Sequence, residues 1–273
     1  MYPELIKFGP ITINSYGVMI TMGFLVSGYL MQGELSRINL DKSFSWKIIF
    51  AALIGGFFGS KIYFLLKHQN LLLEDFWGNL FSVSGLIWHG GLVGGFLAVT
   101  ILVWIYQYDY LQIYDIISPF LLLGQAFGRM GCFLAGDGCY GPPTNLPWGM
   151  RFPEGSVPTL DNLQLQELYA LRYPDLPIPK DIAVHPTPLY HFFLLIIFFF
   201  ILWRFRKNKL KTGTIWGLYL ICAGAERFIT DFWRLTSKYI WGKFSEAQLI
   251  SVGLIIIGSL LLIHLYRPYH RLD

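Results

Sequence analysis

Charged residues are scarce in this chain of 273 residues, of which only 14% are Asp, Glu, Lys or Arg. An ordinary soluble domain has about 25% charged residues. Hydrophobic residues make up 54% of the chain, and the mean hydropathy is +0.49. The polar faces that the helices of a soluble protein need are therefore largely missing. The composition argues against a soluble domain and predicts an integral membrane protein.

Sequence motifs of familiar soluble enzymes are also absent. The chain contains neither a G-x-S-x-G nucleophile elbow nor a phosphate-binding P-loop. It has only 3 cysteines, with no C-x-x-C or H-x-x-x-H pairing, so we expect no metal site and no cofactor. No run of basic residues alternates with aromatic ones, which argues against a nucleic-acid partner. No cationic leader with a cleavage site precedes the first apolar run, so we expect nothing to be removed.

Long apolar runs, by contrast, are frequent. A run of about 20 apolar residues is long enough to cross a bilayer as a helix. Seven such runs predict an all-α polytopic membrane protein with seven transmembrane helices, folded as a single integral membrane domain over residues 1–273. The runs cover residues 14–33, 46–66, 86–106, 113–134, 186–204, 213–232 and 246–266.

The orientation in the membrane follows from the basic residues of the short connections, because such residues are retained on the cytoplasmic side. The segment 204–211 contains five Lys or Arg side chains. We therefore place the connection after the fifth run in the cytoplasm. Seven alternating spans then put the N-terminus outside and the C-terminus in the cytoplasm.

The long segment between the fourth and fifth runs, residues 135–185, is rich in Pro, Gly and aromatic residues. Loops of this length are usually functional or disordered, and the Trp, Met and Phe content argues against disorder. We expect residues 135–185 to form a small folded extracytoplasmic cap. The apolar spacing around Leu160 to Leu171 is roughly helical and predicts one short helix there.

Ionisable residues occur near the span ends that this orientation places outside. A charge at membrane depth is costly and marks a candidate for a functional site. The alternative is that each side chain merely extends its polar end to the lipid headgroups. The cytoplasmic ends show no matching collection of His, Tyr and Asp, which favours one shared outer site. Its members are Tyr16, Lys61, His89, Arg129, His185, Arg227 and Asp231.

Glycines and cysteines near these positions leave alternatives open. Gly90 and Gly91 follow His89 at a spacing of small residues that lets helix backbones approach closely. Helix packing is the favoured interpretation, and room for a lipid headgroup or chain is the alternative. Cys132 and Cys139 either form a disulfide, are inert, or belong to the site.

Four short blocks of polar and small residues lie near these outer ends. They are His89-Gly90-Gly91-Leu92, Gly128-Arg129-x-Gly131, His185-Pro186-Thr187-Pro188-Leu189-Tyr190 and Arg227-Phe228-x-x-Asp231-x-x-Arg234. In this order they resemble the signature blocks of the prolipoprotein diacylglyceryl transferase family. Tyr16 and Lys61 fall in two further blocks, so the resemblance covers nearly the whole chain.

The resemblance implies a seven-helix enzyme of the bacterial inner membrane. Such an enzyme transfers the diacylglyceryl group of phosphatidylglycerol to the lipobox cysteine thiol of a prolipoprotein signal peptide, and releases glycerol phosphate. Six positions depart from the family's pattern, while both arginines of the blocks are retained. The departures leave open either the same reaction or a paralogue with a different donor or acceptor. They are Lys61 for Arg, Cys132 and Ala135 for Asn, Asp137 for Glu, Gly141 one residue late, and His191 for Glu.

This reaction needs a cation beside the departing phosphate and a means of removing the thiol proton. We assign Arg129 and Arg227 to the phosphate, because a guanidinium grips its oxygens with two N–H donors. His89 is the candidate base, or it only hydrogen-bonds lipid or an adjacent helix. Asp231 follows Arg227 at i+4 and is expected to orient its guanidinium, unless the pair is purely structural.

The other residues of the blocks are expected to bind phosphatidylglycerol, the signal peptide or surrounding membrane lipids. The rival interpretation is a transporter or a receptor that binds anionic lipid headgroups without chemistry. Many transporters are built from internal repeats, and the two halves of this chain show no convincing repeat, which favours an enzyme. The expected substrate-binding residues are Tyr16, Lys61, Gly90, Gly91, Cys132, Asp137, Gly141, His185, Tyr190 and Arg234.

Overall fold

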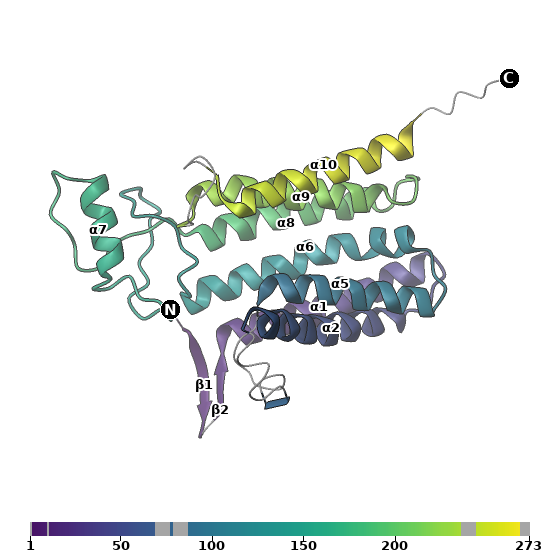
Figure 1. The fold of residues 1–273 in the computed structure, drawn as a ribbon, viewed down its shortest axis with the longest axis horizontal. Helices are drawn as coiled ribbons and strands as arrows, with labels where there is room; N and C mark the ends of the chain where they lie inside the picture. Colours follow the sequence, from purple (N-terminus) through teal and green to yellow (C-terminus); the bar gives the residue numbers. More distant parts are fainter. Residues whose placement is uncertain (1, 10, 69–76, 79–86, 236–243, 268–273) are drawn as a thin grey trace. The chain divides into compact units, whose positions relative to one another are not determined.

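The computed structural model describes residues 2–9, 11–68, 77–78, 87–235 and 244–267. In these ranges the chain is mostly helical (Figure 1). The helices are α1 (Ser15–Arg37), α2 (Phe44–Lys67), α5 (Trp88–Ile105), α6 (Tyr110–Ala135), α7 (Leu163–Arg172), α8 (Thr187–Phe205), α9 (Thr214–Thr230), the short 3-10 helix η1 (Asp231–Trp233) and α10 (Glu246–Tyr266).

Each of the seven apolar runs coincides with a helix. Among the described helices, α1, α2, α6, α8 and α10 are the five that are long and apolar enough to cross a membrane. Two others are shorter: α5 has 18 residues and α9 has 17. The prediction of a mostly helical membrane protein is therefore confirmed, while the number of spans stays a prediction.

The all-α prediction was wrong about one small sheet. Strands β1 (Glu4–Phe8) and β2 (Ile11–Asn14) pair antiparallel, with Lys7 opposite Thr12. The turn between them uses Gly9, whose φ of +57° is a left-handed conformation that glycine adopts without a steric penalty. Strands of only 5 and 4 residues carry too short a periodic pattern to stand out beside a long apolar helix.

The chain divides into two compact units. One unit comprises Met1–Ser27 together with Ile117–Asp273, and the other comprises Gly28–Ile116. The boundaries fall inside α1 and α6, so each of these helices belongs to both units. The first unit also contains the hairpin and helices α7 to α10, while the second contains α2 and α5.

Glycines bring α2 and α5 together in the unit Gly28–Ile116. A Cβ atom added to Gly59 would lie 2.7 Å from the Cα of Gly94, and one added to Gly94 would lie 2.7 Å from the Cα of Gly59. Carbon atoms do not approach so closely without overlap, so neither position accepts a side chain unless the backbone moves. Gly90 and Gly91 on α5 also face backbone or side-chain atoms of α2. The helix-packing interpretation of these glycines is therefore confirmed.

In the other unit, α9 and α10 also meet through glycines. A Cβ atom on Gly224 would lie 2.6 Å from the carbonyl oxygen of Ser251, and one on Gly258 would lie 2.6 Å from that of Gly217. The first turn of α10 is closed by a capping box, in which Ser245 and Gln248 exchange hydrogen bonds between side chain and backbone. The close packing and the cap set the start of α10 beside the end of α9.

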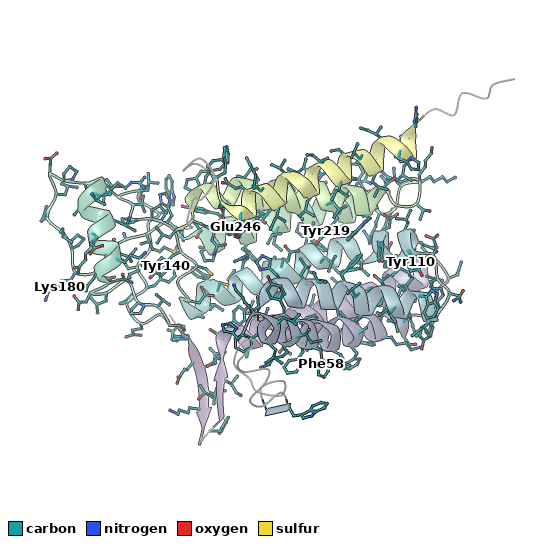
Figure 2. All side chains as sticks on the ribbon, viewed as in Figure 1. Phe58, Tyr110, Tyr140, Lys180, Tyr219 and Glu246 are labelled. Atoms are coloured by element: carbon teal, nitrogen blue, oxygen red, sulfur yellow. The ribbon has the colours of Figure 1, made fainter. Side chains whose placement is uncertain are left out.

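Residues 135–185 contain a small hydrophobic core of their own. Figure 2 shows the side chains of this segment, with Tyr140 and Lys180 labelled. The predicted short helix is present as α7, whose first turn is capped by Asn162: its side-chain oxygen accepts a hydrogen bond from the backbone N–H of Leu165 at 3.1 Å. The buried residues of the core are Tyr140, Phe152, Leu165, Tyr169, Ile182 and Val184.

The glycine contact between α2 and α5 generates a stability prediction. Gly59→Ala should lower the melting temperature of the purified protein in detergent, because overpacking a tight contact costs about 1–3 kcal/mol. Gly33→Ala is the matched control, since a Cβ atom there meets nothing within 4 Å. It should leave stability unchanged or raise it slightly, as alanine is about 1 kcal/mol better than glycine in a helix. Equal melting temperatures for the two variants would contradict the packing.

Candidate active site

Arg227 in the last turn of α9 forms an ion pair with Asp231, the next residue on the same helix face. The Nη2 atom of Arg227 lies 3.3 Å from Oδ1 of Asp231. Asp231 is only 1% exposed, and its other carboxylate oxygen accepts a hydrogen bond from the hydroxyl of Ser245. The carboxylate is therefore held from two sides, by α9 and by the start of α10. This geometry restricts the orientation of the Arg227 guanidinium.

Three guanidinium groups share one region of this unit. Arg129 on α6 is partly buried, and Arg234 follows η1. The positive charges of Arg129 and Arg234 are both close enough to interact electrostatically with the guanidinium of Arg227. The Nη1 atom of Arg227 is buried and has no hydrogen-bond partner among the described residues. Clustered guanidinium groups with a spare donor are suited to an anion with several oxygens, such as a phosphate.

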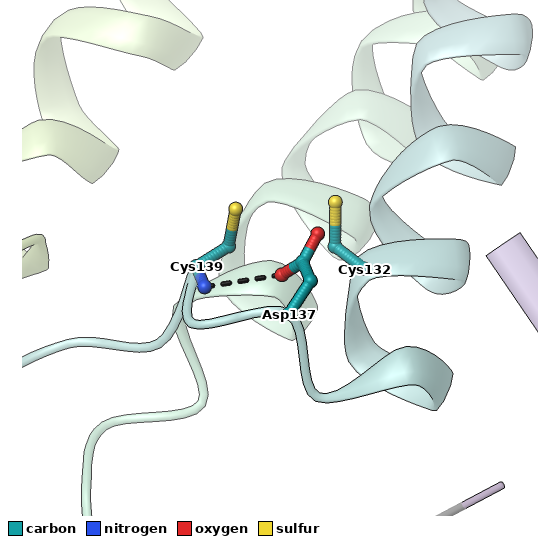
Figure 3. A group of neighbouring side chains, drawn as sticks. All are labelled: Cys132, Asp137 and Cys139. Carbon is teal, nitrogen blue, oxygen red and sulfur yellow. Dashed lines mark hydrogen bonds between the residues drawn. The ribbon is translucent and has the colours of Figure 1, made fainter. Parts of the chain in front are cut away.

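Cys132, Asp137 and Cys139 come together where α6 ends (Figure 3). Both thiols are free, and the two sulfur atoms and one carboxylate oxygen all lie within 4.8 Å of one another. The Asp137 carboxylate also accepts a hydrogen bond from the backbone N–H of Cys139 at 3.1 Å. Such a donor set could hold a metal ion. The positive charges of Arg129 and Arg234, which act on Cys132 and Cys139 respectively, would repel a divalent cation.

A neighbouring thiol favours thiolate chemistry at Cys139. A hydrogen bond from the Cys132 thiol lowers the pKa of Cys139, and the charge of Arg234 lowers it further. Burial and the Asp137 carboxylate oppose this shift without reversing it. Tyr16 at the start of α1 belongs to this group as well, because the ionisable groups of Cys132 and Arg129 act on it.

His185 and Tyr190 lie at the start of α8. The His185 Nδ1 atom and the Tyr190 hydroxyl are 3.1 Å apart, and the indole N–H of Trp148 donates to the same hydroxyl at 3.0 Å. Burial lowers the pKa of His185, and the charge of Arg172 lowers it further, which favours the neutral ring. A pocket of about 530 Å³ opens beside His185 and is lined also by Trp233.

Gly141 fits against the beginning of α8. Its backbone N–H donates to the His185 carbonyl at 2.8 Å, and a Cβ atom here would collide with the carbonyl oxygen of Trp233. A side chain at this position would push apart the segments that carry His185 and Arg234. This close approach explains why glycine occupies position 141, while its part in the substrate site stays a prediction.

Four predicted site residues belong to the unit Gly28–Ile116. Lys61 on α2 is fully buried, whereas His89 is exposed in the first turn of α5. Gly90 and Gly91 lie against α2 in the packing contact described above. The structure thus brings together the arginines, the acidic residues and the cysteines within one unit. That Lys61, His89 and the two glycines complete the same site stays a prediction.

A buried polar pair that the sequence did not predict lies between α8 and α9. His191 and Glu226 are 1% and 4% exposed, and the imidazole Nδ1 atom hydrogen-bonds to a carboxylate oxygen of Glu226. Two sequence signals could have indicated it: Glu226 immediately precedes Arg227, and His191 departs from the Glu of the resembled family. The residues are 35 positions apart, so their contact depends on helix packing.

The cysteine pair generates a labelling prediction. Cys132→Ala removes the thiol that donates to Cys139, so the pKa of Cys139 should rise toward the usual value of about 8.5. Alkylation of Cys139 by iodoacetamide, followed by peptide mass spectrometry between pH 6 and 9, should then need a higher pH. Cys132→Ser keeps a hydroxyl donor and serves as the matched control, with a smaller displacement. Identical pH profiles in all three proteins would show that Cys132 has no influence on Cys139.

Comparison with known proteins is consistent with this arrangement. The sequence profile described as prolipoprotein diacylglyceryl transferase matches residues 3–264. A relative from Clostridium tetani is 31% identical over 265 residues, which cover 94% of this chain and 95% of the relative. A relative from Staphylococcus haemolyticus is 32% identical over 268 residues, covering 96% and 87% of the two chains. One from Erwinia tasmaniensis is 31% identical over 288 residues, covering 99% and 94%.

All three relatives carry the name phosphatidylglycerol--prolipoprotein diacylglyceryl transferase. The profile match spans nearly the whole chain, including the arginine cluster and the segment between α6 and α8. The shared length leaves no large part of the fold unmatched. This chain therefore belongs to the prolipoprotein diacylglyceryl transferase family.

Proposed function

We propose that this protein transfers the diacylglyceryl group of phosphatidylglycerol to the lipobox cysteine thiol of a prolipoprotein signal peptide, and releases glycerol phosphate. The observation that carries the proposal is the cluster of Arg129, Arg227 and Arg234 in a single unit, with the buried Nη1 atom of Arg227 lacking a partner among the described residues. The names of the relatives supply the substrates.

The proposed reaction breaks the bond between a glycerol carbon and a phosphate oxygen. Negative charge then grows on the departing glycerol phosphate. Donors held in place before the reaction stabilise such charge, and a single donor contributes about 3–4 kcal/mol to lowering the barrier. Arg129 and Arg227 take this role, with Asp231 positioning the guanidinium of Arg227 through the ion pair. Arg234 adds positive charge to the same region.

The remaining predicted residues are proposed to shape the binding site. Tyr16, Cys132 and Asp137 belong to the same electrostatic group as Arg129 and are proposed to contact the donor headgroup. Gly141, His185 and Tyr190, which are joined by hydrogen bonds at the start of α8, are proposed to bind the substrates from the side of the segment 135–185. Lys61, Gly90 and Gly91 are proposed to complete the site from α2 and α5. His89, exposed at the start of α5, is a candidate to receive the thiol proton or to bind lipid.

We further propose that both units form one integral membrane domain of seven spans in the bacterial inner membrane. The basic connection from Arg204 to Lys211 would lie in the cytoplasm. Residues 135–185 would then form an extracytoplasmic cap, with the N-terminus outside and the C-terminus in the cytoplasm. This orientation places the arginine cluster near the outer leaflet, where the signal peptide of an exported protein emerges.

If Arg129 and Arg227 bind the phosphate, replacing them should reduce activity far more than replacing an arginine outside the site. Arg129→Lys and Arg227→Lys should each lower the rate of peptide lipidation by about 100-fold, since a point charge does not replace a two-donor fork. The assay supplies the purified protein with phosphatidylglycerol and a lipobox peptide, and mass spectrometry detects both products. Arg204→Lys, an exposed residue at the end of α8, is the matched control and should retain full activity.

Two results would overturn the assignment. Full activity in both site variants would show that neither guanidinium binds the reacting phosphate. A wild-type protein that binds phosphatidylglycerol but forms no lipidated peptide would instead support a non-catalytic lipid binder or transporter.

The topology yields a separate prediction. A cysteine at Glu167, exposed on α7, should react with a membrane-impermeant maleimide in intact spheroplasts. A cysteine at Lys209, exposed in the basic connection, should react only after lysis. The reverse pattern would place the segment 135–185 in the cytoplasm and exclude the proposed orientation.

A further inference from the structure

The buried pair of His191 and Glu226 has the arrangement of a general base. The carboxylate of Glu226 only accepts hydrogen bonds when ionised, so its contact with His191 assigns the ring proton to Nδ1. The hydroxyl of Thr230 lies 3.1 Å from the same Nδ1 atom and itself donates to the Glu226 carbonyl at 2.8 Å. With Nδ1 carrying the proton, the other ring nitrogen, Nε2, has a free lone pair.

That second nitrogen is buried and unpaired among the described residues. The Nε2 atom of His191 has no hydrogen-bond partner there, and the Nη1 atom of Arg227 is in the same state. A buried polar atom without a partner costs about 1–3 kcal/mol, so two of them on side chains whose charges interact indicate a site for a polar ligand. The charges of Arg129 and Arg227 both act on His191. The imidazole therefore lies within electrostatic range of the cluster to which the phosphate is assigned.

One ligand pair satisfies both atoms. A thiol presents a proton to the Nε2 lone pair, and a phosphate oxygen accepts from Nη1 of Arg227. Both groups must be close together for diacylglyceryl transfer, because the sulfur attacks the carbon next to the phosphate. A phosphodiester without a proton could accept from Nη1 but could not donate to Nε2, so a phosphate alone would satisfy only one of the two atoms.

We propose that His191 is a catalytic base that accepts the proton of the acceptor thiol, and that Glu226 is the residue that positions it. This inference rests on the proposed function. The thiol proton moves to Nε2 of His191, and the thiolate sulfur forms a bond with the glycerol carbon of the diacylglyceryl group. The bond from that carbon to the phosphate oxygen breaks, and its electron pair leaves with glycerol phosphate. The imidazolium, balanced by Glu226, then releases its proton to water.

His191→Asn provides a sharp test, because the asparagine amide can still donate to Glu226 from a position close to that of Nδ1, but it supplies no base. We expect kcat to fall by at least about 100-fold, as is typical for a general base. The stabilisation of the protein against heat by added phosphatidylglycerol should be unchanged. Wild-type kcat/KM should rise with pH and level off as His191 loses its proton, whereas the variant should show no such levelling.

The second test changes one of the charged or polar groups that surround His191. They are Glu226, Thr230 and Arg227 on α9 and Arg129 on α6. Glu226→Gln removes the negative charge that stabilises the imidazolium. The acidic limb of the rate profile should therefore move to lower pH in this variant. This displacement tests whether His191 is the base even if His191→Asn fails to fold. A purely structural role for Glu226 would leave the acidic limb of the rate profile at the same pH.

Specific outcomes would overturn the inference. Wild-type activity together with full activity in His191→Asn would exclude His191 as the base while leaving the proposed function intact. An acidic limb that disappears in His89→Asn but not in His191→Asn would assign the base to His89 instead. A wild-type protein that forms no lipidated peptide would remove the proposed function itself.

Discussion

Pairing of polar groups inside an apolar protein is the constraint on which the rest of this structure depends. A charge without a partner is costly away from water, and removing one member of a buried pair leaves the other uncompensated. The Arg227 to Asp231 ion pair meets this requirement, and the hydrogen bond from Ser245 extends it from α9 to α10. The packing of two helices therefore sets the direction of one guanidinium.

Close backbone contact makes that packing possible. Gly224 on α9 and Gly258 on α10 leave no room for a side chain against the facing helix, as do Gly59 and Gly94 between α2 and α5. In a bilayer, burying apolar surface between helices gains little over contact with lipid, so van der Waals packing and interhelical hydrogen bonds hold helices together. Small residues such as these glycines allow the close van der Waals packing. Pairs such as His191 with Glu226 provide the interhelical hydrogen bonds.

At the proposed site, unlike in the rest of this unit, some buried polar groups lack partners among the described residues. Three guanidinium groups share one region with few negative partners, and two buried nitrogen atoms, on His191 and Arg227, lack hydrogen bonds among the described residues. Such defects reduce stability, and proteins concentrate them where function requires them. A site prepared in this way needs no rearrangement of its donors when charge develops on a bound phosphate.

The sequence alone determined the membrane class, the seven helical segments and the blocks around Arg129 and Arg227, because hydropathy and motif spacing are local properties. The hairpin Glu4–Asn14 escaped prediction because its strands are short. Only the tertiary structure decided that His191 meets Glu226, that Cys132 faces Cys139, and that Ser245 reaches Asp231. These contacts join residues on different helices or across loops, and they depend on helix rotation and packing, which a linear pattern of apolar residues does not specify.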